Sequence, residues 1–419
     1  MDKKIYGIDF GTTNSVVAVL EDGEVRVLPI IGNNQNVMRS LIFFPDERGR
    51  YFVGEDAIVE YVESGMDGRI MQSIKSFLSD RSFTGTVMGR KYYTIEDVVA
   101  IIFRELKKRA DSLVGQDVRS AIFGRPAKFS ENPESDSFAQ QRLLKAARQA
   151  GFDEIHFQLE PVAAAFSYES RLHNPETVLV ADLGGGTSDF AVVKLDPQKK
   201  NAYDRSMDIL GYRGICIGGD DLDSQIMSQR LLRYFGSELH YESFEKMLPM
   251  PVHLMRMLHE WHRVFLLKTP KYREFIGTLR RLADDKEAAE RLYALVEEDL
   301  SFSLFGAIER AKLGLSFQEE DVVSFNKSII RIHEVLARGE FERMIAGAVA
   351  SMKECVDLLI ADAGIAVSDI TSVFLTGGIS QIPVIQKLFS DNFGQQKIKS
   401  SDVFVSVAEG LALSARAFF

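Results

Sequence analysis

The chain has little cysteine, no long apolar run and no excess of positive charge, and each shortage excludes a class of protein. Its 419 residues include two cysteines, Cys216 and Cys355, which are too few for the disulfide framework of a small secreted protein. The 60 acidic residues outnumber the 50 basic ones, and the formal charge of −10 argues against a nucleic-acid-binding surface. Apolar runs such as Ser15–Leu20 are far shorter than the roughly 20 residues that a membrane-spanning helix needs.

The N-terminal residues and the overall composition favour a cytoplasmic globular protein. Lys3 and Lys4 are similar to the start of a signal peptide, but Asp9 falls where its apolar region should be. Hydrophobic residues make up 46% and charged residues 26%, as in ordinary globular proteins. At roughly 150 residues per domain, the length predicts two or three compact units.

Two segments containing glycine and threonine, Asp9–Ser15 and Asp182–Asp189, each lie between two β-rich runs. This pattern is typical of a turn that joins the strands of a hairpin. Each segment begins with an aspartate at the same offset from its first glycine. A near-duplicate at such a distance predicts two similar lobes, each of which opens with a hairpin.

Helical periodicity, prolines and glycines predict the other elements. The stretch Leu222–Leu315 is almost wholly helical in pattern and is expected to be inserted in the second lobe. A polar loop is predicted at Ser130–Asp136, and a third glycine pair, Gly377-Gly378, follows a short strand. The remaining predictions are helices at Ile95–Leu113, Gln140–Ala150 and Glu160–Ala165, and strands at Ala121–Phe123 and Val373–Leu375.

Turns of this composition present several backbone N–H groups to one point and can therefore bind a phosphate oxyanion. Two such hairpins facing each other could hold the two ends of a polyphosphate, and Asp9 and Asp182 could hold Mg²⁺, mainly through its retained waters. The turns run from strand to strand, whereas the glycines of the P-loop and of the dinucleotide-binding motif lead into a helix. A single glycine-rich hairpin turn usually binds nothing, but two copies and a third glycine pair favour a functional site.

Four segments together resemble the actin-like ATPase superfamily, namely Asp9–Ser15, Asp182–Asp189, Gly218–Asp220 and Thr376–Gly378. Over nearly the whole chain the details are similar to the nucleotide-binding domain of the DnaK-type heat-shock 70 kDa chaperones. The resemblance is greatest to the short, YegD-like members that lack a peptide-binding domain. It implies an α/β fold with two actin-like (ribonuclease H-like) lobes around a nucleotide cleft and a helical insertion in the second lobe.

The resemblance also implies the domain boundaries. Lobe I would comprise residues 1–171 and 396–419, and lobe II would comprise residues 172–395 with a helical subdomain at about 222–345. A peptide-binding domain is not expected.

Carried over residue by residue, the resemblance implies a complete ATP site. Lys75 matches a lysine that contacts the γ-phosphate and the attacking water, and Glu160 matches a carboxylate near the metal and that water. Asp182 and Thr187 complete the catalytic set, and Asp9 and Asp182 would position hydrated Mg²⁺. These roles suit phosphoryl transfer, which asks a protein chiefly for positioning and charge stabilisation. The residues implied to bind the nucleotide are Gly11, Thr12, Thr13, Asn14, Gly184, Gly185, Gly186, Gly218, Gly219, Asp220, Glu309, Lys312, Ser316, Gly377 and Gly378.

The implied function is that of a chaperone-family ATPase with ATP or ADP and Mg²⁺ as its ligands. Slow hydrolysis, by in-line attack of water on the γ-phosphate, would drive motion of the lobes, and a separate client protein, co-chaperone or nucleotide-exchange protein would respond to it. The alternatives are a nucleotide-sensing or protein-interaction module that does not hydrolyse ATP and, more weakly, a small-molecule kinase of the same superfamily. The kinase would need a catalytic aspartate in a substrate cleft, and the sequence contains no matching motif.

The chain departs from the family pattern at three places, one of which is an aspartate before Val407 that is out of register, with Asp402 the nearest. Leu313 and Gln381 occupy positions where many members carry arginines that sandwich the adenine, which predicts weaker nucleotide affinity or looser base choice. The proline and arginine pair that relays the nucleotide state keeps Pro126, but Gln140 stands in register and Arg142 lies two positions further on.

Overall fold

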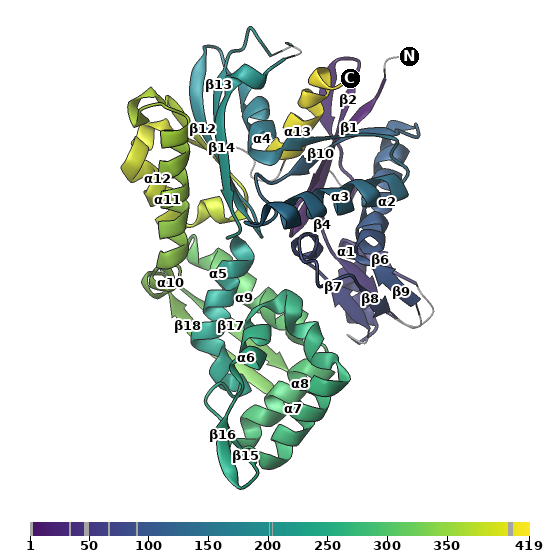
Figure 1. Ribbon diagram of the computed structural model, residues 1–419, viewed down its shortest axis with the longest axis vertical. Coiled ribbons are helices and arrows are strands. Elements are labelled where there is room, and N and C mark those ends of the chain that lie inside the picture. The colour runs from purple at the N-terminus through teal and green to yellow at the C-terminus, as the bar shows by residue number, and fades with distance from the viewer. Residues whose placement is uncertain are drawn as a thin grey trace. The chain divides into compact units, whose positions relative to one another are not determined.

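The computed structural model describes residues 3–32, 35–45, 50–65, 68–88, 91–200, 202, 204–400 and 405–419 (Figure 1). The chain forms two compact units. The first unit comprises Met1–Val59, Met71–Gly219 and Val349–Phe419, and the second comprises Glu60–Ile70 and Asp220–Ala348. The lobe boundaries given above stay a prediction.

The first unit contains two sheets with the same strand order. One sheet, read in the direction that matches the other, runs β3-β2-β1-β10-β11. In it β1, β10 and β11 are parallel, and β1, β2 and β3 form antiparallel pairs. The other runs β14-β13-β12-β19-β20, with β12, β19 and β20 parallel and β12, β13 and β14 antiparallel. The strands are β1 (Ile5–Phe10), β2 (Asn14–Glu21), β3 (Glu24–Val27), β10 (Ser120–Arg125), β11 (Glu154–Leu159), β12 (Glu176–Leu183), β13 (Ser188–Leu195), β14 (Ile209–Ile215), β19 (Ser372–Thr376) and β20 (Ile398–Ser400).

This repetition confirms the α/β class and the duplicated hairpins predicted from the sequence. The hairpin strands β1, β2, β12 and β13 are buried along most of their length, which explains why their sequences are apolar runs rather than an alternation.

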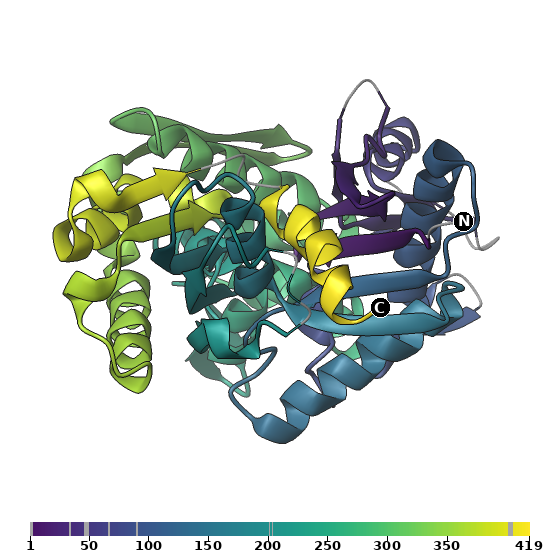
Figure 2. The same cartoon turned by 90° about the horizontal axis from the view of Figure 1, so that it is seen from above.

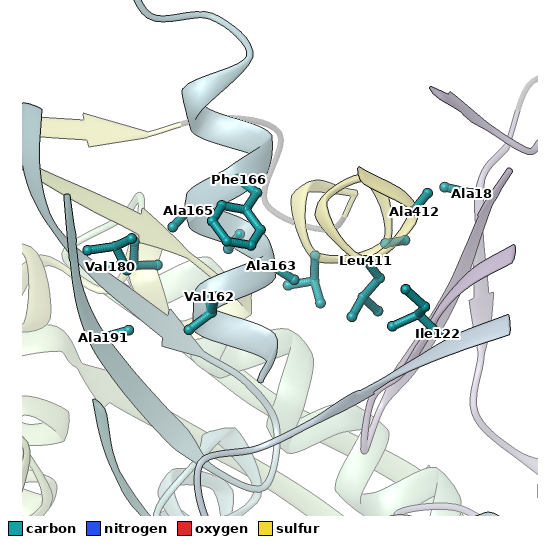
Figure 3. Close-up of a cluster of buried hydrophobic side chains, with 14 of the residues drawn as sticks. Ala18, Ile122, Val162, Ala163, Ala165, Phe166, Val180, Ala191, Leu411 and Ala412 are labelled. Atoms are coloured by element: carbon teal, nitrogen blue, oxygen red, sulfur yellow. The ribbon is translucent and has the colours of Figure 1, made fainter. Parts of the chain in front are cut away.

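Two helices cover the facing sides of these sheets. Helix α4 (Glu160–Glu169) follows β11 but packs on β12 and β13, whereas α13 (Ser406–Ser414) follows β20 but packs on β1 and β2 (Figure 2). The helices cross closely, because a Cβ on Gly410 would overlap the carbonyl oxygen of Ala163. Small side chains therefore hold the shared core together, with Ile122 and Leu411 packed on one side and Val180 and Ala191 on the other (Figure 3).

Two further helices of the first unit matter for the site. Helix α2 (Ile95–Val114) begins with a capping box between Thr94 and Asp97. Helix α3 (Pro133–Gln149) begins earlier than the predicted loop at Ser130–Asp136 allows, because Asn132 caps it and Pro133 suits its first turn. Other elements of this unit are β4 (Val37–Arg39), β5 (Ile42–Phe44), β6 (Phe52–Val53), the 3-10 turn η1 (Ile74–Phe77), β8 (Gly85–Met88), β9 (Lys91–Thr94), most of α11 (Ala346–Asp362), the 3-10 turn η7 (Gly378–Gln381) and α12 (Pro383–Phe393).

The second unit is mainly helical, but the prediction of an almost wholly helical stretch is wrong at one hairpin. Strands β15 (His240–Ser243) and β16 (Lys246–Pro249) pair through Phe244 and Glu245, which both have positive φ angles, of 49° and 61°. Such a turn is usually signalled by Asn-Gly, and its sequence signal is missing here. The other elements are α5 (Gly219–Ile226), α6 (Val252–His259), α7 (Pro270–Leu282), α8 (Lys286–Glu297), α9 (Ser301–Leu315), β17 (Glu320–Lys327), β18 (Ile330–Ala337) and α10 (Arg338–Met344), while α1 (Glu55–Glu63) and β7 (Arg69–Met71) each fall at a boundary between the units.

Among the described residues, we find no helix with the length and hydropathy needed to cross a bilayer.

Candidate functional site

The two glycine-containing hairpins close with the same backbone bond. The N–H of Gly11 donates to the carbonyl of Asn14 at 2.9 Å, and the N–H of Gly184 donates to the carbonyl of Thr187 at 3.0 Å. Each glycine lies two residues after the aspartate of its segment, Asp9 or Asp182. The sequence repeat therefore corresponds to two turns of the same construction.

The two turns lie directly against each other in the first unit. A Cβ on Gly186 would lie 2.7 Å from Oγ1 of Thr12, and one on Gly185 would be still closer to Oγ1 of Thr13. A Cβ at either position would displace a threonine hydroxyl, so this close approach favours glycine. The turns thus bring backbone N–H groups and threonine hydroxyls to one place.

Three more glycines pack against the second hairpin. The N–H of Gly219 donates to the carbonyl of Gly184 at 3.0 Å, and a Cβ on Gly218 would lie 2.5 Å from the backbone of Gly185. Gly377 has a φ of +83°, and a Cβ there would overlap the carbonyl of Leu183. Every predicted glycine except Gly378 therefore makes a described backbone contact around these turns, and Gly378 opens η7 beside Gly377.

Lys75 and Glu160 form a buried ion pair in the same unit. Nζ of Lys75 donates to Oε1 of Glu160 at 2.7 Å, and both side chains are 7% exposed. Glu160 is the first residue of α4, and Gly124 on β10 leaves room for its side chain. Burial lowers the pKa of Lys75, but Glu160 and Asp9 outweigh that effect and hold its pKa above the ordinary value, so the ammonium stays charged.

Three more carboxyl groups surround this pair and are desolvated. Burial, together with the charge of Glu160, raises the pKa of Asp9 to about 7, although Lys75 opposes the shift. Burial raises the pKa of Asp182 well above its ordinary value, and Glu160 and Asp9 add to the shift. Burial and Glu160 also raise the pKa of Asp189 to about 7. The cluster therefore holds more negative charge than Lys75 alone can balance.

Asp189 connects the second hairpin to its surroundings. It pairs across the hairpin with Asp182. Its carboxylate accepts a hydrogen bond from the hydroxyl of Thr187 at 2.7 Å and another from the N–H of Ala127 at 2.7 Å. The hydroxyl of Thr187 is therefore oriented by a buried carboxylate. Gly214 leaves room for that carboxylate, since a Cβ at Gly214 would overlap Oδ1 of Asp189.

Asp9 and Asp182 suit a hydrated cation better than a bare one. No group of three or more histidine, cysteine or acidic side chains in the described part of the chain is arranged to ligate a metal directly. Both residues are only partly buried, although protein atoms desolvate their carboxylates. Mg²⁺ retains several of its waters and is commonly held by one or two carboxylates, so this donor set fits it.

A comparison with protein families identifies the relatives of this chain. The family model described as Hsp70 protein matches residues 50–244 and 289–418, which is well over half of the chain. The chain belongs to the Hsp70 family. Its fold is accordingly the two-lobed actin-like α/β fold of Hsp70 proteins, and the family is one of chaperone ATPases. Whether this Hsp70 chain is of the YegD-like type stays a prediction.

In the second unit of this Hsp70 chain, the predicted adenosine residues lie on or just after α9. Glu309 and Ser316 are partly exposed, whereas Lys312 is buried and its Nζ donates to Oδ2 of Asp223 at 2.8 Å. Burial raises the pKa of Asp223 to about 7, against the opposing effect of Lys312. Asp220, the remaining residue that was predicted to bind the nucleotide, lies on α5 together with Asp223. The sequence prediction missed Asp223, because it lies 89 residues from Lys312 and only the fold brings the two side chains together.

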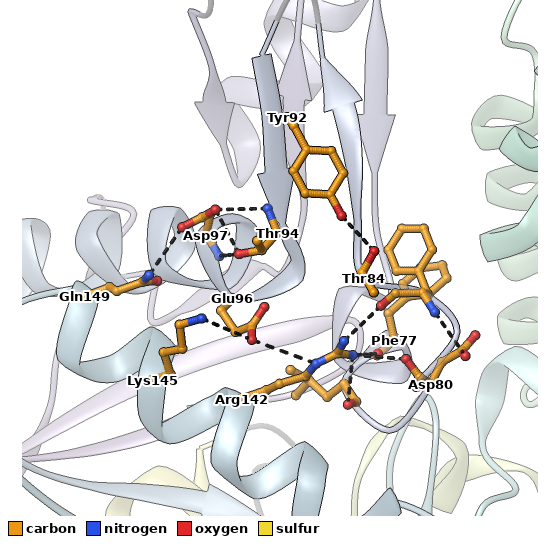
Figure 4. Close-up of polar contacts among 12 residues, drawn as sticks. Phe77, Asp80, Thr84, Tyr92, Thr94, Glu96, Asp97, Arg142, Lys145 and Gln149 are labelled. Atoms are coloured by element: carbon orange, nitrogen blue, oxygen red, sulfur yellow. Dashed lines mark hydrogen bonds and ion pairs between the residues drawn. The ribbon is translucent and has the colours of Figure 1, made fainter.

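The residues near the predicted relay positions have defined partners. Arg125, next to Pro126, donates to the side chains of Gln140 and Asp136 on α3, the latter at 2.9 Å. Arg142 does not join them and is buried against a different segment (Figure 4). No sequence signal marked Arg125, since its partners become neighbours only when α3 packs beside β10.

Proposed function

We propose that this Hsp70-family chain binds Mg-ATP and hydrolyses its γ-phosphate bond. The observation that carries the proposal is the pair of facing hairpin turns, of identical construction, beside a buried lysine and four carboxylates. A family match alone would support only an ancestral ATP site. Here the turns, Lys75 and Glu160 are all present and in mutual contact or proximity.

Each part of the cluster would act on a different part of the reaction. The backbone N–H groups and the hydroxyls of Thr12 and Thr13 would bind phosphate oxygens. The charged ammonium of Lys75 would stabilise the negative charge that develops on the γ-phosphate in the transition state. The carboxylate of Glu160 would orient the attacking water or accept its proton. Asp189 would keep the hydroxyl of Thr187 aimed at one place.

Mg²⁺ would be held, through its waters, by Asp9 and Asp182. When bound, it would neutralise phosphate charge and relieve repulsion among the carboxylates. The raised pKa values of Asp9 and Asp182 support this role, because they arise from burial and from neighbouring carboxylates whose charge a bound cation would offset.

The proposal extends to the conformational change that hydrolysis would cause and to the proteins that would respond to it. We expect hydrolysis to shift the conformation of the chain, and we expect a separate client protein, co-chaperone or nucleotide-exchange protein to respond in the cytoplasm. The Hsp70 match supports this expectation, since family members couple nucleotide to protein partners. Glu309, Lys312 and Ser316 would contribute to binding of the adenosine.

The decisive experiment measures binding and turnover separately. Titration calorimetry with Mg-ATP tests binding, and phosphate release tests turnover, for the wild type and for Lys75→Ala and Asp182→Asn. Lys107→Ala is a matched control, because Lys107 is also a buried, ion-paired lysine of the first unit but lies outside the cluster. We expect both site variants to lose phosphate release and the control to keep it.

Two other outcomes would change the conclusion. Wild-type binding without turnover would favour the alternative, a nucleotide-sensing or interaction module. Absence of Mg-ATP binding by the folded wild type would refute the proposal.

A further inference from the structure

Arg142 is a buried arginine whose guanidinium donates hydrogen bonds to backbone carbonyls of one segment, Phe77–Phe83. It projects from α3 and is 4% exposed. Its two terminal nitrogens donate to four carbonyl oxygens (Figure 4). These belong to Phe77 at 3.0 Å, Asp80 at 3.1 Å, Leu78 at 3.3 Å and Phe83 at 3.1 Å.

The positive charge is held in place from two other sides. Nε of Arg142 lies 4.0 Å from Oε1 of Glu96 on α2, and the guanidinium lies 4.2 Å above the ring of Phe138. Burial lowers the pKa of Arg142, while Glu96 and Asp80 oppose the shift. An arginine nevertheless stays charged, and its planar fork of five donors is the one side chain that can serve so many carbonyls at once.

The segment that Arg142 holds is the one that carries Lys75. Lys75 lies in η1, and its carbonyl accepts the N–H of Leu78 at 3.1 Å. The carbonyl of Leu78 in turn accepts from Arg142. Only two hydrogen bonds therefore separate the guanidinium from the backbone of Lys75.

The entry to η1 is a conformation that needs outside support. Ser73 has a φ of +50° and is fully buried, and its carbonyl accepts the N–H of Ser76. A residue other than glycine keeps such a left-handed angle only where its surroundings fix it. The next residues of the loop are also fixed, because the carboxylate of Asp80 accepts the N–H groups of Ser82 and Phe83.

We propose that Arg142 is a positioning residue for Lys75, and that it holds η1 so that the ammonium remains 2.7 Å from Glu160. The inference rests on the proposed ATPase function, in which Lys75 acts on the γ-phosphate. Arg142 itself touches neither the two turns nor Glu160 in the described contacts. An error of about 1 Å in the position of a catalytic group can slow a reaction about 100-fold, so this indirect role has a measurable effect.

The test compares Arg142→Gln with Arg205→Gln. Arg205 is a matched control, because it is a buried arginine of the first unit whose bidentate bonds go to Glu169 instead of the Lys75 segment. We expect Arg142→Gln to lower kcat by about 100-fold with little change in KM for ATP, and Arg205→Gln to retain the wild-type kcat. In a Lys75→Ala background, Arg142→Gln should cause no further loss, because both changes remove the same contribution.

A second measurement keeps the inference testable if activity fails for another reason. Hydrogen exchange at the amides of Ser76 and Leu78 reports whether η1 is held. It should speed up in Arg142→Gln, to a smaller degree in Arg142→Lys, and stay unchanged in Arg205→Gln. If the wild type does not turn over ATP, the proposed function is wrong, and exchange at these two amides alone decides whether Arg142 positions Lys75. A folded Arg142→Gln protein with unchanged exchange, or with unchanged kcat in an active enzyme, would overturn the inference. If Arg142→Gln does not fold, Arg142→Lys is judged by the same criteria.

Discussion

A buried lysine pairs with a carboxylate in each of the two units, with nearly the same geometry. Lys75 lies 2.7 Å from Glu160 in the first unit, and Lys312 lies 2.8 Å from Asp223 in the second. Their surroundings differ. Asp9, Asp182 and Asp189 add negative charge around the first pair, whereas Asp220 and Glu309 do so around the second pair, which joins helices α5 and α9.

The comparison shows that a buried ion pair does not by itself indicate chemistry. Such a pair contributes little net stability, because desolvation offsets most of the attraction. What distinguishes the first pair is the two facing glycine turns and the larger number of carboxylates around it. The first region is therefore suited to a cation and a polyphosphate, whereas the second pair joins α5 to α9 beside the residues proposed to bind the adenosine.

The largest expected effect comes from removing the lysine of each pair. Both Lys75→Leu and Lys312→Leu leave a buried carboxylate without its partner, and the usual cost is about 3–5 kcal/mol of stability. We expect Mg²⁺ to restore much of the melting temperature of Lys75→Leu, because the cation replaces the lost positive charge among several carboxylates. Mg²⁺ should not restore Lys312→Leu. Thermal melts with and without Mg²⁺ measure the melting temperatures of both variants. If Mg²⁺ restored both variants, or neither, the two ion pairs would not differ in the way we expect.

The glycine turns and the surrounding helices could be predicted from the sequence for a physical reason. The conformation of the segments Asp9–Ser15 and Asp182–Asp189 is determined locally, since a turn depends on its own few residues. Helices such as α2 also follow from local periodicity and from the cap at Thr94.

The parts that could not be predicted depend on contacts between distant segments. Asp223 and Lys312 are 89 residues apart and meet only in the folded structure. The acceptors of Arg142 are backbone carbonyls, which leave no trace in the sequence. The hairpin at Phe244 lacks the residues that normally mark such a turn.

The pH dependence of stability should also separate the two regions. The pKa values of Asp9 and Asp189 rise from 3.8 to about 7 on folding, as does that of Asp223. The folded state thus holds these protons more tightly than the unfolded chain. Its stability from these groups is greatest below pH 3.8 and is lost as the pH rises to about 7.

Magnesium should counter only the part of this loss that arises in the first unit. Melting temperatures at about pH 5 and pH 8, with and without Mg²⁺, measure it. We expect Asp189→Asn to reduce the Mg²⁺-sensitive part and Asp223→Asn to reduce the insensitive part. If the wild type without Mg²⁺ gains stability between these pH values, the raised pKa values do not govern the profile.

A smaller effect is expected from adding a methyl group at one glycine in each region. Gly218→Ala would push a Cβ against the backbone of Gly185, and overpacking of this kind costs about 1–3 kcal/mol. Gly314→Ala would instead meet the carboxylate of Asp321, the end of a side chain that can rotate away, on a helix that favours alanine. We expect Gly218→Ala to lower both stability and Mg-ATP affinity, and Gly314→Ala to leave them nearly unchanged. Equal losses in the two variants would contradict this account of the close approach.

The smallest effect concerns the nucleotide base and the exposed face of α9. Leu313 is 45% exposed, and the resemblance predicts that its position corresponds to an adenine-stacking arginine of many family members. Stacking of a guanidinium on an aromatic ring contributes about 0.5–2 kcal/mol, so Leu313→Arg should raise ATP affinity by about 2- to 30-fold. Leu358→Arg is the matched control, because Leu358 is a helical leucine of nearly equal exposure, 44%, on α11. Calorimetric titration with ATP, GTP and CTP distinguishes stacking from simple charge attraction. A gain for the purine nucleotides over CTP that only Leu313→Arg shows would place the base near α9, whereas an equal gain for all three nucleotides, or the same gain in the control, would reflect net charge alone.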